Sequence, residues 1–433
     1  MLNIKDIRKI EWSQVEPEPL GGDLAEDLGK IINKFVKYSL NDWWKGKGFN
    51  KESKNEYLAM KGPYDRVIRQ SVYIAKTISA CVKFKFYDES EVGFKLFVAR
   101  DRYMKLLRSC LYHHSANISG GWGLNDEHLQ VVTELLYVCW LVWDKLNIRD
   151  QQLAINVLNS EIKKAKDYEI NYNFSPDGSS NDLFECQTIV NMDNANLLYL
   201  ASVMISKNSL SAELREKAIL AYRACFSSKE DSDMQGYNVA EDMLLYRFDT
   251  RSPFAISYIG VGIKAFIFSK IAEQDLPSGV TRNFKQIYST FYSSTTNDDG
   301  RKTGLFTIYD KKNRPQGGVL YPDGMRGGKV NESALYVMDI FAFCLGVSDV
   351  NDITPREWAK VRMKEIEKNF KKNFKYTIQG CNQYRFLHGE AVCSQLADCY
   401  LALFLYLVAK KADNNFVDKF SREEYGQEPD GEA

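Results

Sequence analysis

The sequence predicts an all-α protein with the α/α-toroid fold. In this fold helical hairpins are arranged side by side in a ring, which can be complete or incomplete. Apolar residues recur at spacings of three and four along most of the 433 residues, which is the pattern of amphipathic helices. Polar, glycine-containing loops separate these stretches, as expected for consecutive helical hairpins. Strand-like segments are confined to 304–309 and 318–321, so only minor, short β segments are expected, and those in loops.

Three helices are predicted before residue 113, at 22–40, 64–84 and 91–112. In each of them the apolar residues fall on one face, which is the face expected to pack against the rest of the protein. Those residues include Leu24, Leu28, Ile31, Phe35 and Leu40 in the first helix, Val67, Ile68, Ile74 and Ile78 in the second, and Phe94, Phe97, Met104 and Leu107 in the third.

The next helix, 126–146, is the most apolar of the set, and Asn125 or Asp126 is a suitable N-cap for it. The same spacing predicts further helices along the remainder of the chain. They cover 149–168, 193–206, 211–226, 255–273, 281–292, 332–346, 355–371 and 389–411. One toroid domain is therefore expected over residues 1–417, followed by a polar tail at 418–433 that is predicted to be disordered.

Charge and cysteine content exclude several classes of protein. Lysine plus arginine equals aspartate plus glutamate, 57 each, so the basic excess typical of nucleic-acid binders is absent. The nine cysteines are scattered and form no CxxC pair, which favours neither a disulfide framework nor a structural zinc site. The first residues lack the apolar stretch of a signal peptide, and no membrane span is expected. These observations predict a cytoplasmic protein without a bound metal or cofactor.

Three of the four histidines lie within sixteen residues: His113, His114 and His128. Histidine titrates near neutrality, so this loop is the first candidate for acid–base chemistry. His113 or His114 is the predicted base, with His114 the first choice, and His128 is expected to face the same cavity. Asn117 and Trp122 are predicted to hold a substrate, so His114→Ala is expected to lose activity without unfolding. The alternative is that these histidines only cap helices or fill the core.

Four other polar stretches precede predicted helices. The segment 171–196 contains amides and carboxylates, among them Asp193 and Asn194, which suit a hydroxyl-rich ligand but can also cap a helix. The segment 236–258 contains Asn238, Arg247 and Tyr258. An arginine there can neutralise a substrate carboxylate or join a surface salt-bridge network.

The remaining two stretches are a glycine-rich loop and a short polar turn. The loop at 314–329 includes Arg326, and loops of this length are usually functional or mobile. The turn before the last helix contains His388 and Glu390, of which Glu390 also suits a helix N-terminus. The substrate-binding residues predicted from these four stretches are Asp193, Asn194, Arg247, Arg326, His388 and Glu390.

Several catalytic motifs are absent from the sequence. It contains no GxSxG, HExxH, P-loop or Rossmann glycine pattern. The segment Asn181-Asp-Leu-Phe-Glu185 is only distantly similar to the acidic motif of helical terpene cyclases, and it has no good second motif.

Four segments in chain order carry a resemblance to a known family. They are Gly121-Trp122 with the apolar helix Glu134–Leu146, the run starting at Asp193-Asn-Ala-Asn, Gly236-Tyr-Asn238, and Tyr321-Pro-Asp-Gly324. Over roughly residues 95–345 the chain resembles the toroid domain of heparinase II/III-like and alginate-lyase-like proteins. The resemblance implies an α/α toroid and an elimination next to a uronate carboxylate. It also implies that Asn238 neutralises that carboxylate and that Tyr258 or His114 moves the proton.

The chain departs from those lyases in two respects. The stretch after Asn238 contains no histidine where the lyases have one, and the predicted helices continue to near the end of the chain where the lyases have a β-sandwich. The first hypothesis is therefore an enzyme that acts on a polyhydroxylated or uronate-like substrate by elimination or hydrolysis. Its expected partner is a small molecule or an oligosaccharide. The alternatives are a tailoring enzyme or cyclase for a small specialised metabolite, and a non-catalytic scaffold that binds a glycan or peptide.

Overall fold

The computed structural model describes most of the chain between residues 1 and 412. The described ranges are 1–10, 22–52, 54–61, 64–123, 128–179, 187–206, 208–240, 262–277, 279–304, 307–309, 312, 315–319, 332–350, 352–370, 374–376 and 387–412. The predicted N-caps Asn125 and Asp126, most of the loop 314–329, and the tail 418–433 lie outside these residues.

The protein is mostly helical, with 65% of it in helices, as the sequence predicts. The helices are α1 (Asp23–Tyr38), α2 (Trp44–Gly46), α3 (Tyr64–Lys83), α4 (Glu89–Val92), α5 (Leu96–Tyr112), α6 (Leu129–Leu141), α7 (Ile148–Asp167), α8 (Gln187–Met204), α9 (Ser209–Cys225), α10 (Ile263–Ile271), α11 (Phe284–Tyr292), α12 (Glu332–Cys344), α13 (Pro355–Asn369) and α14 (Gly389–Ala412). Short turns η1 (Ile4–Asp6), η2 (Ser39–Trp43) and η4 (Trp143–Lys145) accompany them.

Two predicted helix boundaries differ from the observed ones for local reasons. The helix predicted at 91–112 begins only at Leu96, because α4 ends at Gly93, whose φ of 76° is left-handed. The helix predicted at 193–206 extends back to Gln187, since the polar residues before Asp193 continue the helix instead of capping it. The first part of the predicted helix 255–273 lies outside the described residues.

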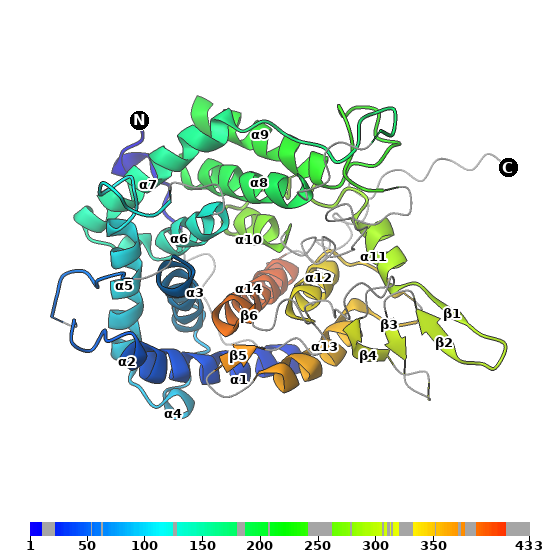
Figure 1. Cartoon of the computed structure of the whole chain (residues 1–433), viewed down its shortest axis with the longest axis horizontal. Helices are drawn as coiled ribbons and strands as arrows, with labels where there is room; N and C mark the ends of the chain where they lie inside the picture. Colours follow the sequence, from blue (N-terminus) through cyan, green and yellow to red (C-terminus); the bar gives the residue numbers. More distant parts are fainter. Residues whose placement is uncertain are drawn as a thin grey trace.

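The strands form small antiparallel pairs between helices. They are β1 (Ser294–Thr296) with β2 (Lys302–Gly304), β3 (Thr307–Tyr309) with β4 (Pro315–Val319), and β5 (Lys375–Tyr376) with β6 (Leu387–His388). The described residues of the predicted segments 304–309 and 318–321 fall on β2, β3 and the end of β4. In Figure 1 the β1–β2 pair projects from the helices at one side of the molecule.

The helices divide into a central and a peripheral set. In Figure 1, α3, α6, α8, α10, α12 and α14 lie around the centre of the view, and α1, α5, α7, α9 and α13 lie outside them. Within the central set, α3 contacts α6, α6 contacts α8, and α8 contacts α10. α14 contacts α3, α10 and α12, whereas α10 and α12 contact each other only slightly. α6, α8, α10, α12 and α14 are apolar around most of their circumference, as expected for helices that are covered on most sides, whereas α3 is amphipathic.

The first residues of the chain lie across the ends of three central helices. The Arg8 amide donates to the Met204 carbonyl at 2.7 Å, and its guanidinium donates to the Ala272 carbonyl at 2.9 Å. The Trp140 indole donates to the Arg8 carbonyl at 2.9 Å. Since α6, α8 and α10 all terminate beside Arg8, these three helices run in the same direction.

Within two further pairs of central helices, α3 with α6 and α12 with α14, the helices also run in the same direction. Near the start of α3 and α6, the Tyr64 and His128 rings are 3.7 Å apart. Ser333, at the start of α12, donates to Gln395 of α14 at 3.0 Å, and Phe343 contacts Tyr406 near the ends of the same helices. The polar stretches identified in the sequence all precede or open central helices.

Within the described residues, α14 is the one helix with the length and composition of a membrane span. The stretch Gly389–Leu407 has 19 residues, and 83% of its apolar window is buried inside the protein. The sequence predicts no membrane span, and this stretch contains the charged residue Asp398. Burial on this scale is typical of a core helix.

Candidate functional site

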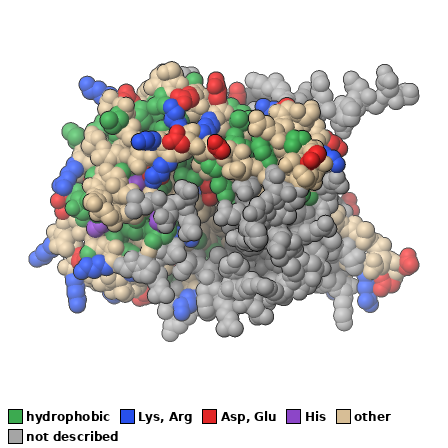
Figure 2. All heavy atoms as spheres, turned by 45° about the horizontal axis from the view of Figure 1, so that its top comes forward, with side chains coloured by type: hydrophobic (Ala, Val, Ile, Leu, Met, Phe, Trp, Pro, Cys, Tyr) green, Lys and Arg blue, Asp and Glu red, His purple; other side chains and the backbone are tan. Residues whose placement is uncertain are grey.

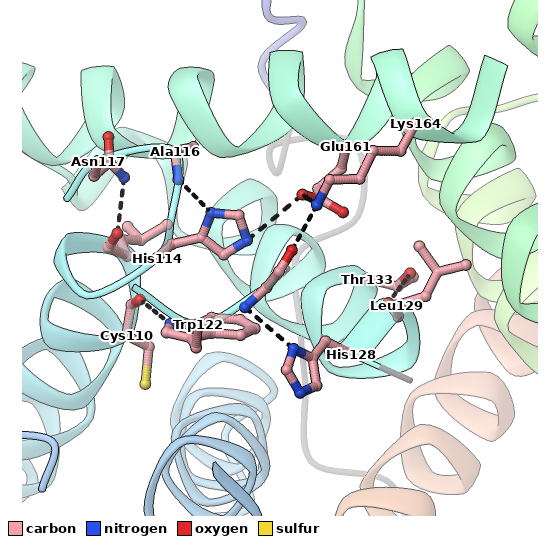
Figure 3. Close-up of polar contacts among 12 residues, drawn as sticks. Cys110, His114, Ala116, Asn117, Trp122, His128, Leu129, Thr133, Glu161 and Lys164 are labelled. Carbon is pink, nitrogen blue, oxygen red and sulfur yellow. Dashed lines mark hydrogen bonds and ion pairs between the residues drawn. The ribbon is translucent and has the colours of Figure 1, made fainter. Parts of the chain in front are cut away.

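The histidine loop between α5 and α6 is held by its own backbone. The Ser115 amide donates to the Trp122 carbonyl at 2.7 Å, and the Trp122 amide donates to the His113 carbonyl at 3.1 Å. The Trp122 indole donates to the Cys110 carbonyl at 2.9 Å (Figure 3). The loop is thus folded back onto the end of α5.

Side chains of α7 fix the other side of the loop. Asn156 donates to the Asn117 side chain at 2.9 Å, and Asn117 itself donates to the Leu111 carbonyl at 2.8 Å. Lys164 donates to the Gly123 carbonyl at 2.5 Å, while the Gly123 amide donates to His128 Nδ1 at 3.1 Å (Figure 3). Asn117 and His128 therefore both help to hold this loop in place.

His114 is fully buried in this loop. Its Nδ1 accepts from the Ala116 amide at 3.2 Å, which leaves the proton on Nε2, 3.6 Å from Glu161 Oε1. Burial, followed by the charge of Lys164, lowers the pKa of His114 to about 4. The imidazole is neutral at pH 7. Gly123 packs against it so closely that a Cβ there would lie 2.2 Å from Nε2.

We expect His114 to make the protein less stable in acid. Its folded pKa of about 4 lies below the usual 6.5, so between these values the unfolded chain binds a proton that the folded protein does not. Wild-type stability is therefore expected to fall by about 2 kcal/mol more than that of His114→Gln between pH 7 and pH 5. Urea unfolding of both proteins at the two pH values measures this difference. Parallel pH dependence would contradict the assignment.

The other predicted site residues lie in several places. Asn194 is buried in α8 and donates to the Val190 carbonyl of the same helix at 2.9 Å. Asn238 is buried and donates to the Ala224 carbonyl at 2.7 Å, while its Oδ1 accepts from the Asn173 amide. The Asn238 side chain thus satisfies a carbonyl group in the last turn of α9. Glu390 is buried in the first turn of α14, where the helix dipole favours a carboxylate.

Several predictions cannot be placed, because their residues are not described. Arg247, Tyr258 and Arg326 lie outside the described residues, and so does the side chain of His388. The structure brings together His114, Asn117, Trp122 and His128, and it places Asp193 and Asn194 on a different helix, α8. Catalysis by His114, Tyr258, Asn238 or His128 stays a prediction.

A buried group of charges lies among the central helices, and the sequence analysis did not identify it. We call it the charged cluster: Lys76 of α3, Glu134 of α6, Lys264 of α10 and Asp398 of α14. Lys76 Nζ lies 2.7 Å from Glu134 and 2.5 Å from Asp398, and Lys264 Nζ lies 2.5 Å from Glu134. All four side chains are buried.

Asp193 extends this cluster toward the solvent. It is half-buried on α8, and the charges of Lys264, Glu134 and the half-buried Arg69 act on its carboxyl. Burial raises the pKa of Asp193 to about 6, with Lys264 opposing that rise. Tyr73 lies nearby on α3, and its hydroxyl donates to Gln130 of α6 at 3.4 Å. Asp193 is thus a carboxyl that can change protonation near neutral pH.

The buried carboxyls of the charged cluster differ in their ionisation. Burial opposes the ionisation of Glu134, but Lys264 and Lys76 outweigh it and hold the pKa of Glu134 below its usual range. Burial raises the pKa of Asp398 to about 6, although Lys76 opposes this rise. Glu134 is therefore the permanent anion between two lysines. Among the described residues, no group of His, Cys, Asp and Glu side chains is arranged to hold a metal ion.

On the face seen in Figure 2, basic and acidic side chains of the described residues are interspersed, without a concentration of charge like that of the cluster.

Comparison with protein-family models finds no match for this chain, and no match is found among curated proteins or solved structures. The site must therefore be interpreted from its own residues.

Proposed function

We propose that the central helices α3, α6, α8, α10, α12 and α14 form the inner ring of an α/α toroid. The support is that α3, α6, α8 and α10 contact one another in turn, that α14 contacts α3, α10 and α12, and that the helices run in the same direction within the groups α6, α8 and α10, α3 and α6, and α12 and α14. In this arrangement the first residues of the chain lie across one end of the ring. The polar loops lie at the other end, where a substrate would enter.

We propose that the protein is an enzyme that uses Asp193 for acid–base chemistry at this entrance. The observation that carries the proposal is the charged cluster, together with Asp193, a partly exposed residue of α8 whose carboxyl is influenced by Lys264 and Glu134 of the cluster. Buried ion pairs contribute little net stability compared with apolar packing, so folding alone does not account for a cluster drawn from four helices. Clusters with shifted pKa values are concentrated at functional sites.

Unpaired atoms beside the cluster support the same interpretation. Asp398 Oδ1 and the Tyr137 hydroxyl are buried and have no hydrogen-bond partner within the described residues. A region optimised only for stability pairs such groups, because each unpaired one costs about 1–3 kcal/mol.

The proposed substrate is polyhydroxylated or uronate-like. The Gln130 amide and the Tyr73 hydroxyl can donate and accept hydrogen bonds, and the guanidinium of Arg69 suits a substrate carboxylate. In an elimination, the Asp193 carboxylate would take the proton from the carbon next to the substrate carboxylate. The electron pair left on that carbon would form a C=C bond, the C–O bond at the neighbouring carbon would break, and the leaving oxygen would take up a proton from solvent. In a hydrolysis, the same carboxylate would take a proton from a water whose oxygen bonds to the sugar carbon, while the C–O bond to the leaving sugar breaks and its oxygen takes up a proton from solvent. The histidine loop then supports the entrance and does not perform the chemistry.

Asp193→Asn is expected to reduce kcat/KM by about 10²–10⁴-fold, because a positioned acid or base contributes that much. Purified protein would be incubated with uronate-containing and neutral oligosaccharides. Elimination is followed by the ultraviolet absorbance of the unsaturated product, and hydrolysis by new reducing ends. Asp177→Asn, a matched change at an exposed turn, is the control. Absence of turnover with the whole panel, or full activity in folded Asp193→Asn, would refute the proposal.

A further inference from the structure

Tyr64 and Arg69 form an arginine–aromatic contact in the first turns of α3. The guanidinium carbon of Arg69 lies 5.5 Å from the centre of the Tyr64 ring, which is within the range of a cation–π contact. Both side chains are partly exposed. A guanidinium that lies over an aromatic face can still present its N–H edge to a carboxylate, because the donors lie in the plane of the group.

The histidine loop and the start of α6 support the Tyr64 ring. This ring lies 3.7 Å from the His128 ring and 5.8 Å from the Trp122 ring. Both of these neighbours are fixed in turn (Figure 3), because His128 Nδ1 accepts from the Gly123 amide at 3.1 Å and the Trp122 indole donates to the Cys110 carbonyl at 2.9 Å. Tyr64 therefore packs against two side chains that hydrogen bonds hold in place.

Arg69 lies on the side of α3 that also presents Tyr73. The two residues are one helical turn apart, and residues at this spacing share a helix face. The Tyr73 hydroxyl donates to Gln130 of α6 at 3.4 Å, and Gln130 is partly exposed like Arg69. A guanidinium suits a carboxylate, whereas a phenol and an amide suit hydroxyl groups. This combination matches a sugar with a carboxylate better than a neutral sugar.

We propose that Tyr64 is a positioning residue, whose ring holds the Arg69 guanidinium in the orientation that binds the carboxylate of an acidic sugar. The inference takes its class of substrate from the proposed function, but it concerns recognition and not the acid–base step. The histidine loop then contributes to binding indirectly, since it supports Tyr64. A neutral sugar has no carboxylate for Arg69, so the preference for acidic over neutral sugars is the property that Tyr64 controls.

The test is the binding of uronate disaccharides and of neutral disaccharides that carry CH2OH in place of each carboxylate, measured by titration calorimetry. Arg69→Gln is expected to bind the uronates about 10–100-fold more weakly, because a charge-assisted hydrogen bond is lost. Tyr64→Leu is expected to bind them about 3–10-fold more weakly, because the cation–π contact is lost. Tyr64→Phe keeps the aromatic ring and is expected to stay within about twofold of the wild type. The affinity for the neutral sugars is expected to change less than about twofold in all three variants.

Tyr57→Leu is the matched control. Arg149 lies 5.3 Å from the centre of the Tyr57 ring, which stacks on Tyr112 at 4.1 Å, so the same change removes a second arginine–tyrosine contact. Arg149 also pairs with Glu56. This variant is expected to bind uronate disaccharides like the wild type, because its arginine is already paired with a carboxylate of the protein.

A folded Tyr64→Leu variant that keeps the wild-type preference for uronates would overturn the proposal. A wild-type protein that binds acidic and neutral disaccharides equally, or binds neither, would overturn it as well. If Tyr64→Leu does not fold, Tyr64→Met takes its place with the same expectation, since its long, flexible side chain can fill more of the space beside His128.

The binding measurement needs no turnover, which separates this proposal from the proposed function. Uronates that bind through Tyr64 and Arg69 but are not converted would refute the proposed function and leave the role of Tyr64 intact. Turnover that depends on Asp193, with an affinity for uronates that does not depend on Tyr64, would have the opposite meaning.

Discussion

Glu134→Gln is expected to lower the free energy of unfolding by about 3–5 kcal/mol, the usual cost of removing one partner from a buried ion pair. Glu134 lies 2.7 Å from Lys76 and 2.5 Å from Lys264, and all three side chains are buried. The amide cannot neutralise either lysine. Within the charged cluster, Asp398 is then the remaining carboxylate. It contacts Lys76, and Lys264 keeps no carboxylate of the cluster in direct contact.

Urea unfolding followed by tryptophan fluorescence measures this loss. Glu365→Gln is the matched control, because Glu365 pairs with Lys368 at 2.6 Å on the surface of α13 and the lysine is largely exposed. Its expected effect is below about 1 kcal/mol. A loss of less than about 1 kcal/mol in Glu134→Gln would show that the charged cluster is not formed as described.

Asp339→Asn is expected to destabilise the protein by a similar amount, about 3–5 kcal/mol. Asp339 of α12 accepts from Tyr288 of α11 at 3.1 Å, and its other oxygen lies 3.1 Å from the Arg362 guanidinium of α13. Arg362 and Asp339 are fully buried. A guanidinium cannot lose its proton in a protein, so Arg362 would stay charged without a counterion.

The double variant Asp339→Leu/Arg362→Met tests the reason for that loss. It removes both charges and is expected to be more stable than Asp339→Asn, because no uncompensated ion remains in the core. Urea unfolding of this double variant, the single variants Asp339→Leu and Arg362→Met, Asp339→Asn and the wild type measures the coupling. A double variant at least as unstable as the sum of the two single variants would mean that the charges do not compensate each other.

The sequence was sufficient to predict the helices, and local physics explains why. Apolar residues such as Leu28, Ile32 and Phe35 are buried on one face of α1, as their spacing requires. The short strands were predicted less well. β5 and β6 consist of two residues each and pair across a separation in sequence, and two residues provide no alternation to recognise.

The site was predicted only in part, since its residues meet over long sequence distances. Lys76 and Asp398 are 322 residues apart, and no local pattern pairs them. A usable signal did exist, because Lys76, Glu134 and Asp398 are each a charge inside an otherwise apolar helical run. The histidine loop was predicted as a site because it contains three of the four histidines of the chain. Contacts such as Asn156 with Asn117 come from α7, which composition cannot indicate.

The proposed function depends on Asp193 being a carboxyl beside the charged cluster that changes protonation near neutral pH. The most direct test is the pH titration of the Asp193 carboxyl in the wild-type protein by ¹³C NMR. The account predicts a midpoint at about 6. A midpoint near 4, the ordinary value for an aspartate in water, would contradict it.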